Sequence, residues 1–143
     1  MRAIIAVNSA GYIGLNNKLP WKCSEDLKHF KRLTNGCNLL VGYNTYQTLP
    51  KLENRRIQLD HDEFLLMCER LKDADEELKF LADNVHNCWC IGGKKTYEKY
   101  CHLFKELHIS HINDNTTGDT LYPNFSNLNP DCKIFNYYFE PNI

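Results

Sequence analysis

Short apolar segments separated by polar, helix-like stretches recur along this chain. Most of them lack the polar alternation of a half-exposed strand, which is typical of strands covered on both faces in a parallel sheet. The expected strands lie at residues 3–7, 38–42, 55–59, 87–91, 106–112 and 132–139. Because strands alternate with helices, the pattern predicts an α/β fold with a mostly parallel central sheet and helices on both faces. Residues 3–7 should form a central strand.

The first helix is expected to carry an acid on its apolar side. Ser24 is a candidate N-cap, because its hydroxyl can accept a hydrogen bond from a free backbone N–H in the first turn. Helical spacing then puts Asp26, Phe30 and Leu33 on one face, with Leu27 beside them. A buried carboxylate is costly unless it is hydrogen-bonded or protonated, and such acids are enriched at functional sites. The alternative is that Asp26 only favours the helix dipole.

The later helices are less sharply defined by the pattern. Residues 74–84 are expected to form a helix with Leu78 and Leu81 facing inward, and residues 94–103 should form another. Residues 64–68 fit either a short strand or the start of a helix, and we favour a strand.

Glycine-containing turns follow two of the expected strands. Gly42 precedes Thr45 after one strand, and Gly92–Gly93 follow another. Free N–H groups at a helix start can bind phosphate, and a glycine lets a ligand approach the backbone closely. A simple turn or cap explains either glycine equally well. The topology would gather candidate ligand-binding residues at one edge of the sheet: Ala6, Asp26, Gly42, Gly92 and Ser110.

Composition restricts the class of partner. The chain has 143 residues, a formal net charge of −1 and seven cysteines, which suits one small domain without the basic surface that nucleic-acid binding requires. No long apolar run predicts a membrane span or leader segment. The odd number of cysteines favours a reducing, cytoplasmic location. Cys88 and Cys90 should face one way as buried thiols; neither has the spacing of a zinc site, and no metal is expected.

Four segments resemble the dihydrofolate reductase family. They are IIAVNSAGYIGLNNKLPWKCSEDLKHFK, GYNTYQTLP, CIGGKKTYEKY and TTGDTLYP, in the family order. The residues of the first segment that stand at the family spacing are Ile13, Gly14, Leu19, Pro20, Trp21 and Asp26. The resemblance covers most of the chain and weakens after the fourth segment. It implies one dihydrofolate-reductase-like domain over residues 1–143, in which the Gly92–Gly93 peptide bond is cis.

The resemblance implies reduction of 7,8-dihydrofolate to 5,6,7,8-tetrahydrofolate by hydride from NADPH, in support of one-carbon and thymidylate synthesis. Asp26 would hold the amidine-like edge of the pterin and help the ring to take a proton through water. Ser110 would brace Asp26 through that water, and Trp21 would hold a water near the pterin. These three are the implied catalytic residues.

The resemblance also assigns binding residues, each of which has a plainer reading as a core or surface residue. The implied substrate-binding residues offer backbone carbonyls, apolar packing for the rings and a cation for the glutamate tail; they are Ile4, Ile5, Leu27, Phe30, Leu49, Arg55 and Ile91. Arg56 is an alternative to Arg55 for the tail. The implied cofactor-binding residues cover the nicotinamide and surround the phosphates; they are Ala6, Ile13, Gly14, Leu19, Gly42, Tyr43, Asn44, Thr45, Leu59, Asp60, His61, Gly92, Gly93, Lys94, Lys95, Thr96, Tyr97 and Thr120.

Several cofactor positions depart from the family pattern. Tyr43 and Asn44 stand where the family usually has an arginine and a further basic residue, which removes positive charge from the adenosine phosphate site. Asp60 and His61 replace a hydroxyl and a basic residue, and an acid there would repel a 2′-phosphate but accept from a free ribose diol. The lysine pair at 94–95 would place two cations near the pyrophosphate. We expect NADPH as the cofactor, with some tolerance of NADH.

The last residues of the chain also depart from the family pattern. Family members usually finish with a long two-stranded hairpin, whereas residues 124–143 provide one good strand. We expect a monomer. Because an exposed strand edge invites pairing, a dimer through edge strands is the alternative.

Three functions remain open from the sequence. A divergent dihydrofolate reductase is preferred, since Asp26, Phe30 and Arg55 favour folate. The second is a reductase of the same fold that acts on another pteridine or an aminopyrimidine. The third is a non-catalytic folate- or nucleotide-binding module, because a fold alone does not determine activity.

Overall fold

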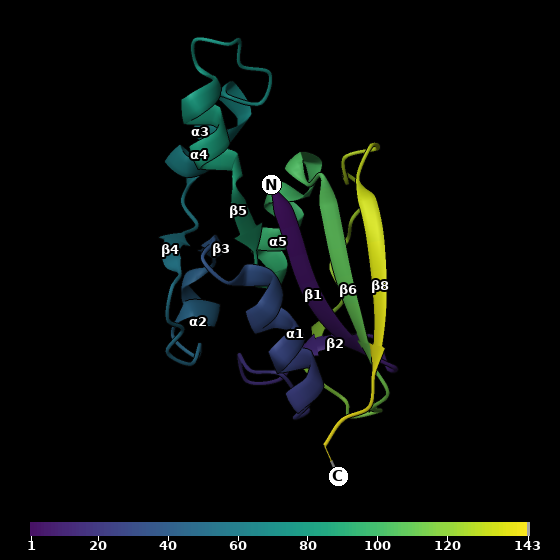
Figure 1. Ribbon diagram of the computed structural model, residues 1–143. Coiled ribbons are helices and arrows are strands. Elements are labelled where there is room, and N and C mark those ends of the chain that lie inside the picture. Colours follow the sequence, from purple (N-terminus) through teal and green to yellow (C-terminus); the bar gives the residue numbers. More distant parts are fainter. Residues whose placement is uncertain (143) are drawn as a thin grey trace.

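The computed structural model describes residues 1–142 and is built around a six-stranded sheet (Figure 1). In chain order its strands are β1 (Arg2–Asn8), β3 (Asn38–Val41), β4 (Arg56–Leu59), β5 (Cys88–Cys90), β6 (Glu106–Ile112) and β8 (Lys133–Phe139). They all pair in parallel, in the spatial order β4-β3-β5-β1-β6-β8. The expected central position of the first strand is therefore confirmed, as is the parallel α/β sheet.

Helices cover both faces of this sheet, as the pattern predicts. The helices of the described residues are α1 (Ser24–Thr34), α2 (Tyr43–Tyr46), α3 (Asp62–Arg70), α4 (Lys79–His86) and α5 (Lys94–Tyr100), followed by the 3₁₀ turn η1 (Cys101–Leu103). Ala3, Ile5 and Val7 of β1 join a core with α5 on one face. Ile4 and Trp89 pack against α1 on the other face. Within residues 1–142, no helix combines the length and apolar character needed to cross a bilayer.

The seven cysteines are free thiols. Cys88 and Cys90 lie in the same core, while Trp89 between them packs on the opposite face of the sheet. The expectation that these two thiols face one way and are buried is confirmed. Burial raises the pKa of the Cys88 thiol to about 11, so it stays protonated and behaves as an apolar core group.

The start of α1 differs from the sequence prediction. Ser24 is the first helical residue rather than the N-cap; Cys23 occupies the N-cap position and makes no side-chain capping hydrogen bond. Asn142 satisfies the helix start instead. Its Oδ1 accepts from the Ser24 backbone N–H at 3.1 Å, and its Nδ2 donates to the Ser24 Oγ at 2.9 Å. This partner lies 118 residues away in the sequence, so no local pattern could indicate it.

The buried side of α1 is also more polar than the predicted face. Asp26 and His29 are buried, Phe30 is partly buried, and Leu27 is exposed. The His29 ring centroid lies 4.1 Å from that of Tyr137 in β8. The helix therefore packs over β8 through a histidine, which an apolar pattern counts as a solvent-facing residue.

Residues 64–68 form part of α3, so the predicted strand is wrong. His61 caps this helix, because its Nδ1 accepts from the Phe64 backbone N–H at 3.2 Å. Phe64 and Cys68, four residues apart, are then buried together on one helical face.

The helix predicted over residues 74–84 begins only at Lys79, as α4. Leu78 and Leu81, which were expected to face inward, are exposed. The reason is visible in Figure 1, where α3 and α4 project beyond one end of the sheet, so α4 has no sheet face to cover. Consistent with this position, α4 contains no buried residue.

The remaining strands frame the ends of the fold. β2 (Tyr12–Gly14) pairs with β7 (Thr120–Leu121) in a small antiparallel sheet. The expected last strand is confirmed as β8, which pairs with β6 along its whole length and forms the outer edge of the large sheet.

Candidate active site

The carboxyl ends of β1, β3 and β5 open into a cleft of about 740 Å³. This is the usual place for ligands in an open α/β sheet. The structure brings most of the predicted site residues together here. Those that line the cleft are Ile4, Ile5, Ala6, Ile13, Gly14, Leu19, Asp26, Leu27, Phe30, Gly42, Tyr43, Asn44, Thr45, Leu49, Asp60, Ile91, Gly93, Lys94, Lys95, Thr96, Tyr97 and Thr120.

Asp26, in the first turn of α1, supplies a buried acid to this cleft. Burial raises the pKa of its carboxyl group, because the ionised form loses contact with water. Among the described residues, no lysine, arginine or histidine forms an ion pair with Asp26. Its charge is therefore available to a ligand, and its proton is held more firmly than that of an exposed aspartate.

Trp21 and Ser110 lie behind the cleft wall rather than on it. Both are buried, and the Trp21 Nε1 and Ser110 Oγ have no hydrogen-bond partner within residues 1–142. Trp21 packs against Ala6, which lines the cleft and is the register partner of Ser110 across β1 and β6. Unpaired buried polar atoms commonly mark places for a bound water or ligand. The water-mediated roles implied for these two residues stay predictions.

The two glycine turns meet in space. The Gly42 N–H donates to the Gly92 carbonyl at 2.7 Å, and the Gly92–Gly93 peptide bond is cis, as the family resemblance implies. A Cβ added to Gly42 would stand 2.9 Å from the Thr96 Oγ1. Gly42 and Gly93 are the N-cap residues of α2 and α5, and neither helix has a side-chain cap. First-turn N–H groups of both helices are thus available to an anionic ligand in the cleft.

Tyr97 connects α5 to β1 at the centre of the cleft. Its buried hydroxyl donates to the Ile4 backbone carbonyl at 2.6 Å. Burial raises the pKa of Tyr97 well above its usual value, so this hydroxyl stays protonated and keeps donating. A carbonyl oxygen has two lone pairs, and Ile4 can therefore accept a second hydrogen bond from a ligand.

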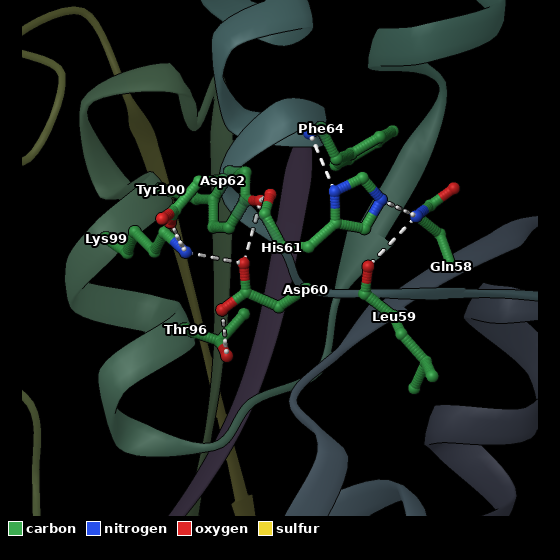
Figure 2. Close-up of polar contacts among 9 residues, drawn as sticks. All are labelled: Gln58, Leu59, Asp60, His61, Asp62, Phe64, Thr96, Lys99 and Tyr100. Atoms are coloured by element: carbon green, nitrogen blue, oxygen red, sulfur yellow. Dashed lines mark hydrogen bonds and ion pairs between the residues drawn. The ribbon is translucent and has the colours of Figure 1, made fainter.

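Three side chains hold Asp60, which lines the cleft (Figure 2). The Thr96 Oγ1 donates to its Oδ2 at 3.1 Å, while the Tyr100 hydroxyl and the Lys99 Nζ contact its Oδ1 at 2.9 and 3.0 Å. Lys99 also pairs with Asp62 at 2.8 Å. The Lys99 ammonium is thus shared between two carboxylates, and the bond from Thr96 to Asp60 fixes the start of α5 against the end of β4.

Some predicted residues do not reach the cleft surface; besides Trp21 and Ser110 they are Arg55, Leu59, His61 and Gly92. The Arg55 guanidinium is fixed at the end of α1, where its Nε donates to the Thr34 Oγ1 at 3.0 Å and its Nη2 donates to the Lys31 carbonyl at 2.6 Å. His61 caps α3, so its ring is used by the protein.

Asn17 and Lys18, which lie between the predicted residues Ile13 and Leu19, also line the cleft, and sequence reasoning missed three further lining residues, namely Cys23, Thr48 and Pro50. The Thr48 Oγ1 donates to the Asn17 carbonyl at 2.7 Å, which ties the loop after β2 to the end of α2 across the cleft. Asn16 and Asn17 both have positive φ. Adjacent asparagines tolerate this backbone conformation and are a turn signal in the sequence.

Comparison with known proteins identifies a consistent set of relatives. A family profile described as dihydrofolate reductase matches residues 1–132. Dihydrofolate reductase type 1 of Escherichia coli is 30% identical over 98% of this chain and 90% of its own length. Dihydrofolate reductase type 9 of Escherichia coli is 30% identical over 84% of this chain and 74% of its own length. The dihydrofolate reductase of Mycoplasma genitalium is 32% identical over 82% of this chain and 79% of its own length. The dihydrofolate reductase from Enterococcus faecalis, solved with NADP(H) and RAB-propyl, superposes with a TM-score of 0.61 at 24% identity, covering 87% of this chain and 77% of its own.

Proposed function

The chain belongs to the dihydrofolate reductase family, and we propose that it reduces 7,8-dihydrofolate to 5,6,7,8-tetrahydrofolate with NADPH. The observation that carries this function is the buried, unpaired carboxylate of Asp26 facing a mostly apolar cleft. A flat heterocycle with a polar edge fits such a cleft, because the acid can meet the edge while apolar side chains pack its faces.

Asp26 binds the amidine-like edge of the pterin through a paired, charge-assisted contact. The product carries one more proton on the ring than the hydride alone supplies, and Asp26 promotes its uptake. A water held by the unpaired Trp21 Nε1 and Ser110 Oγ would relay that proton, which accounts for two buried polar atoms that the protein itself leaves unsatisfied. Leu27 and Phe30 pack against the rings.

NADPH is the cofactor, and when bound it supplies the hydride. The residues present fit this group. Gly42 and Gly93 keep side chains out of the space where two uncapped helix starts meet, and their backbone can approach phosphate closely. Lys94 and Lys95 add positive charge at the same place. Ala6 also lines the cleft, and its small side chain leaves room for the nicotinamide ring.

Asp60 does not prevent NADPH binding in this proposal. Its carboxylate pairs with Lys99, which it shares with Asp62, and accepts from Thr96 and Tyr100 (Figure 2). Both of its oxygens are therefore occupied within the protein, and a 2′-phosphate would meet a partly compensated charge. The test is a spectrophotometric assay in which dihydrofolate is mixed with NADPH or NADH. We expect dihydrofolate-dependent oxidation of both, faster with NADPH. If dihydrofolate binds while neither cofactor is oxidised, the protein is a binding module and not a reductase.

We propose that Arg55 binds the glutamate tail of the substrate beyond the cleft lining. Its Nε and Nη2 donate to Thr34 and Lys31, which fixes the guanidinium, and a guanidinium with five N–H groups can still donate to a carboxylate. We expect Arg55→Leu to raise the KM for dihydrofolate by about 10-fold or more, the loss of a charge-assisted hydrogen bond. Steady-state kinetics with dihydrofolate and with a dihydropterin that lacks the tail would measure this. The tail-less substrate should be insensitive to the change.

Arg56→Leu is the matched control, since Arg56 is the exposed neighbour on β4. It should leave the KM nearly unchanged. An increase in KM with Arg56→Leu and not with Arg55→Leu would move the tail contact to Arg56. Equal turnover of both substrates by the wild type would favour another pteridine as the natural substrate.

The family profile spans residues 1–132 and one six-stranded sheet runs through the described residues, so we propose that residues 1–143 form one dihydrofolate-reductase-like domain. The seven free thiols suit a reducing compartment, and we place the protein in the cytoplasm on that ground.

A further inference from the structure

The outer edge of the large sheet is formed by β8, and no strand pairs with its free side within residues 1–142 (Figure 1). The Lys133 N–H donates to the Lys105 carbonyl and the Phe139 carbonyl accepts from the Asn113 N–H, both on the β6 side. Because peptide groups alternate along a strand, the N–H and C=O groups of Ile134, Asn136 and Tyr138 point outward. The edge therefore presents three residues whose backbone can pair with another strand.

This edge lacks the usual protection against pairing. Natural edge strands are short or carry lysine or proline in the middle, whereas β8 has seven residues and its one charge, Lys133, stands at the start. Large apolar side chains are exposed on both faces: Ile134 is 52%, Phe135 38% and Tyr138 76% exposed. Such a strand is suited to being covered.

We propose that a second copy of this chain covers the edge, by antiparallel pairing of β8 with β8 about a twofold axis at Asn136. The register is self-complementary. The three outward residues form the hydrogen-bonded pairs, with Ile134 opposite Tyr138 of the second copy and Asn136 opposite itself. Phe135 stands opposite Tyr137 on the other face. Aliphatic–aromatic and aromatic pairs of this kind stabilise antiparallel strands, and no like charges meet.

The position of α1 leaves room for this arrangement. His29 of α1 lies 4.1 Å from Tyr137 and 5.4 Å from Phe139 between ring centroids, so the helix covers the second half of β8. In an antiparallel pair, the second half of one strand lies beside the first half of the other. The two copies of α1 are therefore staggered, and the twelve strands form one continuous sheet that closes at two copies.

The test is the mass of the intact chain by size-exclusion chromatography with light scattering over a series of concentrations. The wild type should reach twice the chain mass. Asn136→Lys and Asn136→Glu each place like charges across the axis, and each should raise the dimer dissociation constant by at least about 100-fold. An equimolar mixture of the two variants should dimerise again, because opposite charges then meet.

Asn127→Lys and Asn127→Glu are matched controls, since Asn127 is an exposed asparagine in the loop before β8; both should dimerise as the wild type does. Recovery in the mixture shows that the Asn136 variants are folded. A wild type that stays monomeric at every concentration, assemblies larger than a dimer, or Asn136 variants that dimerise alone would each overturn the proposal.

Discussion

Asp26→Asn should lower kcat/KM for dihydrofolate by about 100-fold or more at neutral pH, the usual contribution of a general acid–base group. Asparagine keeps the shape of the side chain but cannot carry the charge that holds the pterin edge and favours ring protonation. The rate of the variant should recover partly at low pH, where the substrate is already protonated in solution. A pH series of steady-state kinetics on both proteins measures this, and a fully active variant would remove Asp26 from the mechanism.

The same variant should be more stable than the wild type at neutral pH, which separates a chemical loss from unfolding. Burial raises the pKa of Asp26 in the folded state, so the ionised carboxylate is disfavoured by folding. The free-energy cost of burying the ionised carboxylate is absent below the pKa of Asp26 in the unfolded chain, which is about 3.9, and complete above its pKa in the folded chain. Denaturant unfolding should therefore give a higher free energy of unfolding for Asp26→Asn than for the wild type at neutral pH. This difference should disappear as the pH falls below the pKa of Asp26 in the unfolded chain. Lower stability at neutral pH would contradict this account of the site.

Gly42→Ala should weaken NADPH binding by about 10- to 100-fold, comparable with losing one or two hydrogen bonds to a charged group. The new Cβ would stand 2.9 Å from the Thr96 Oγ1. Thr96 cannot simply turn away, because its hydroxyl donates to Asp60, which Lys99 and Tyr100 hold in place (Figure 2). The two phosphate-binding turns must move apart instead. Quenching of tryptophan fluorescence by NADPH measures the affinity.

Overpacking of this kind should also lower the free energy of unfolding by about 1–3 kcal/mol. The double variant Gly42→Ala with Thr96→Ala removes the oxygen that the methyl meets, and it should regain most of this stability relative to Gly42→Ala alone. Gly42→Ala with Thr96→Ser keeps the oxygen and should regain none. Equal stability of the two double variants would show that Thr96 is not the obstacle.

The parts of the site that follow from strand ends were predictable from the sequence. The apolar runs at residues 3–7, 38–42 and 87–91 place Ala6, Gly42 and Gly92 toward the carboxyl ends of three parallel strands, and the structure has them there. Asp26 was also predictable, since helical spacing puts it on the buried side of α1. In each case a local pattern determines the position.

The features that were missed depend on contacts between distant segments. Asn142 reaches Ser24 from the opposite end of the chain, and His29 is buried only because β8 lies beneath α1. Asp60 reads as a free charge in the sequence, yet it pairs with Lys99 of α5. Charge balance and capping of this kind belong to the packed structure and leave no periodic signal.

The most direct test of the proposed chemistry follows the transferred hydrogen. NADPH carrying deuterium at the reactive position of the nicotinamide should be mixed with dihydrofolate and the wild-type chain, and the tetrahydrofolate analysed by mass spectrometry. Hydride transfer in the cleft predicts that each product molecule gains one deuterium, and that Asp26→Asn slows its appearance without changing the amount gained per product. Product without the label, or labelled cofactor that is never consumed while dihydrofolate binds, would contradict the assignment.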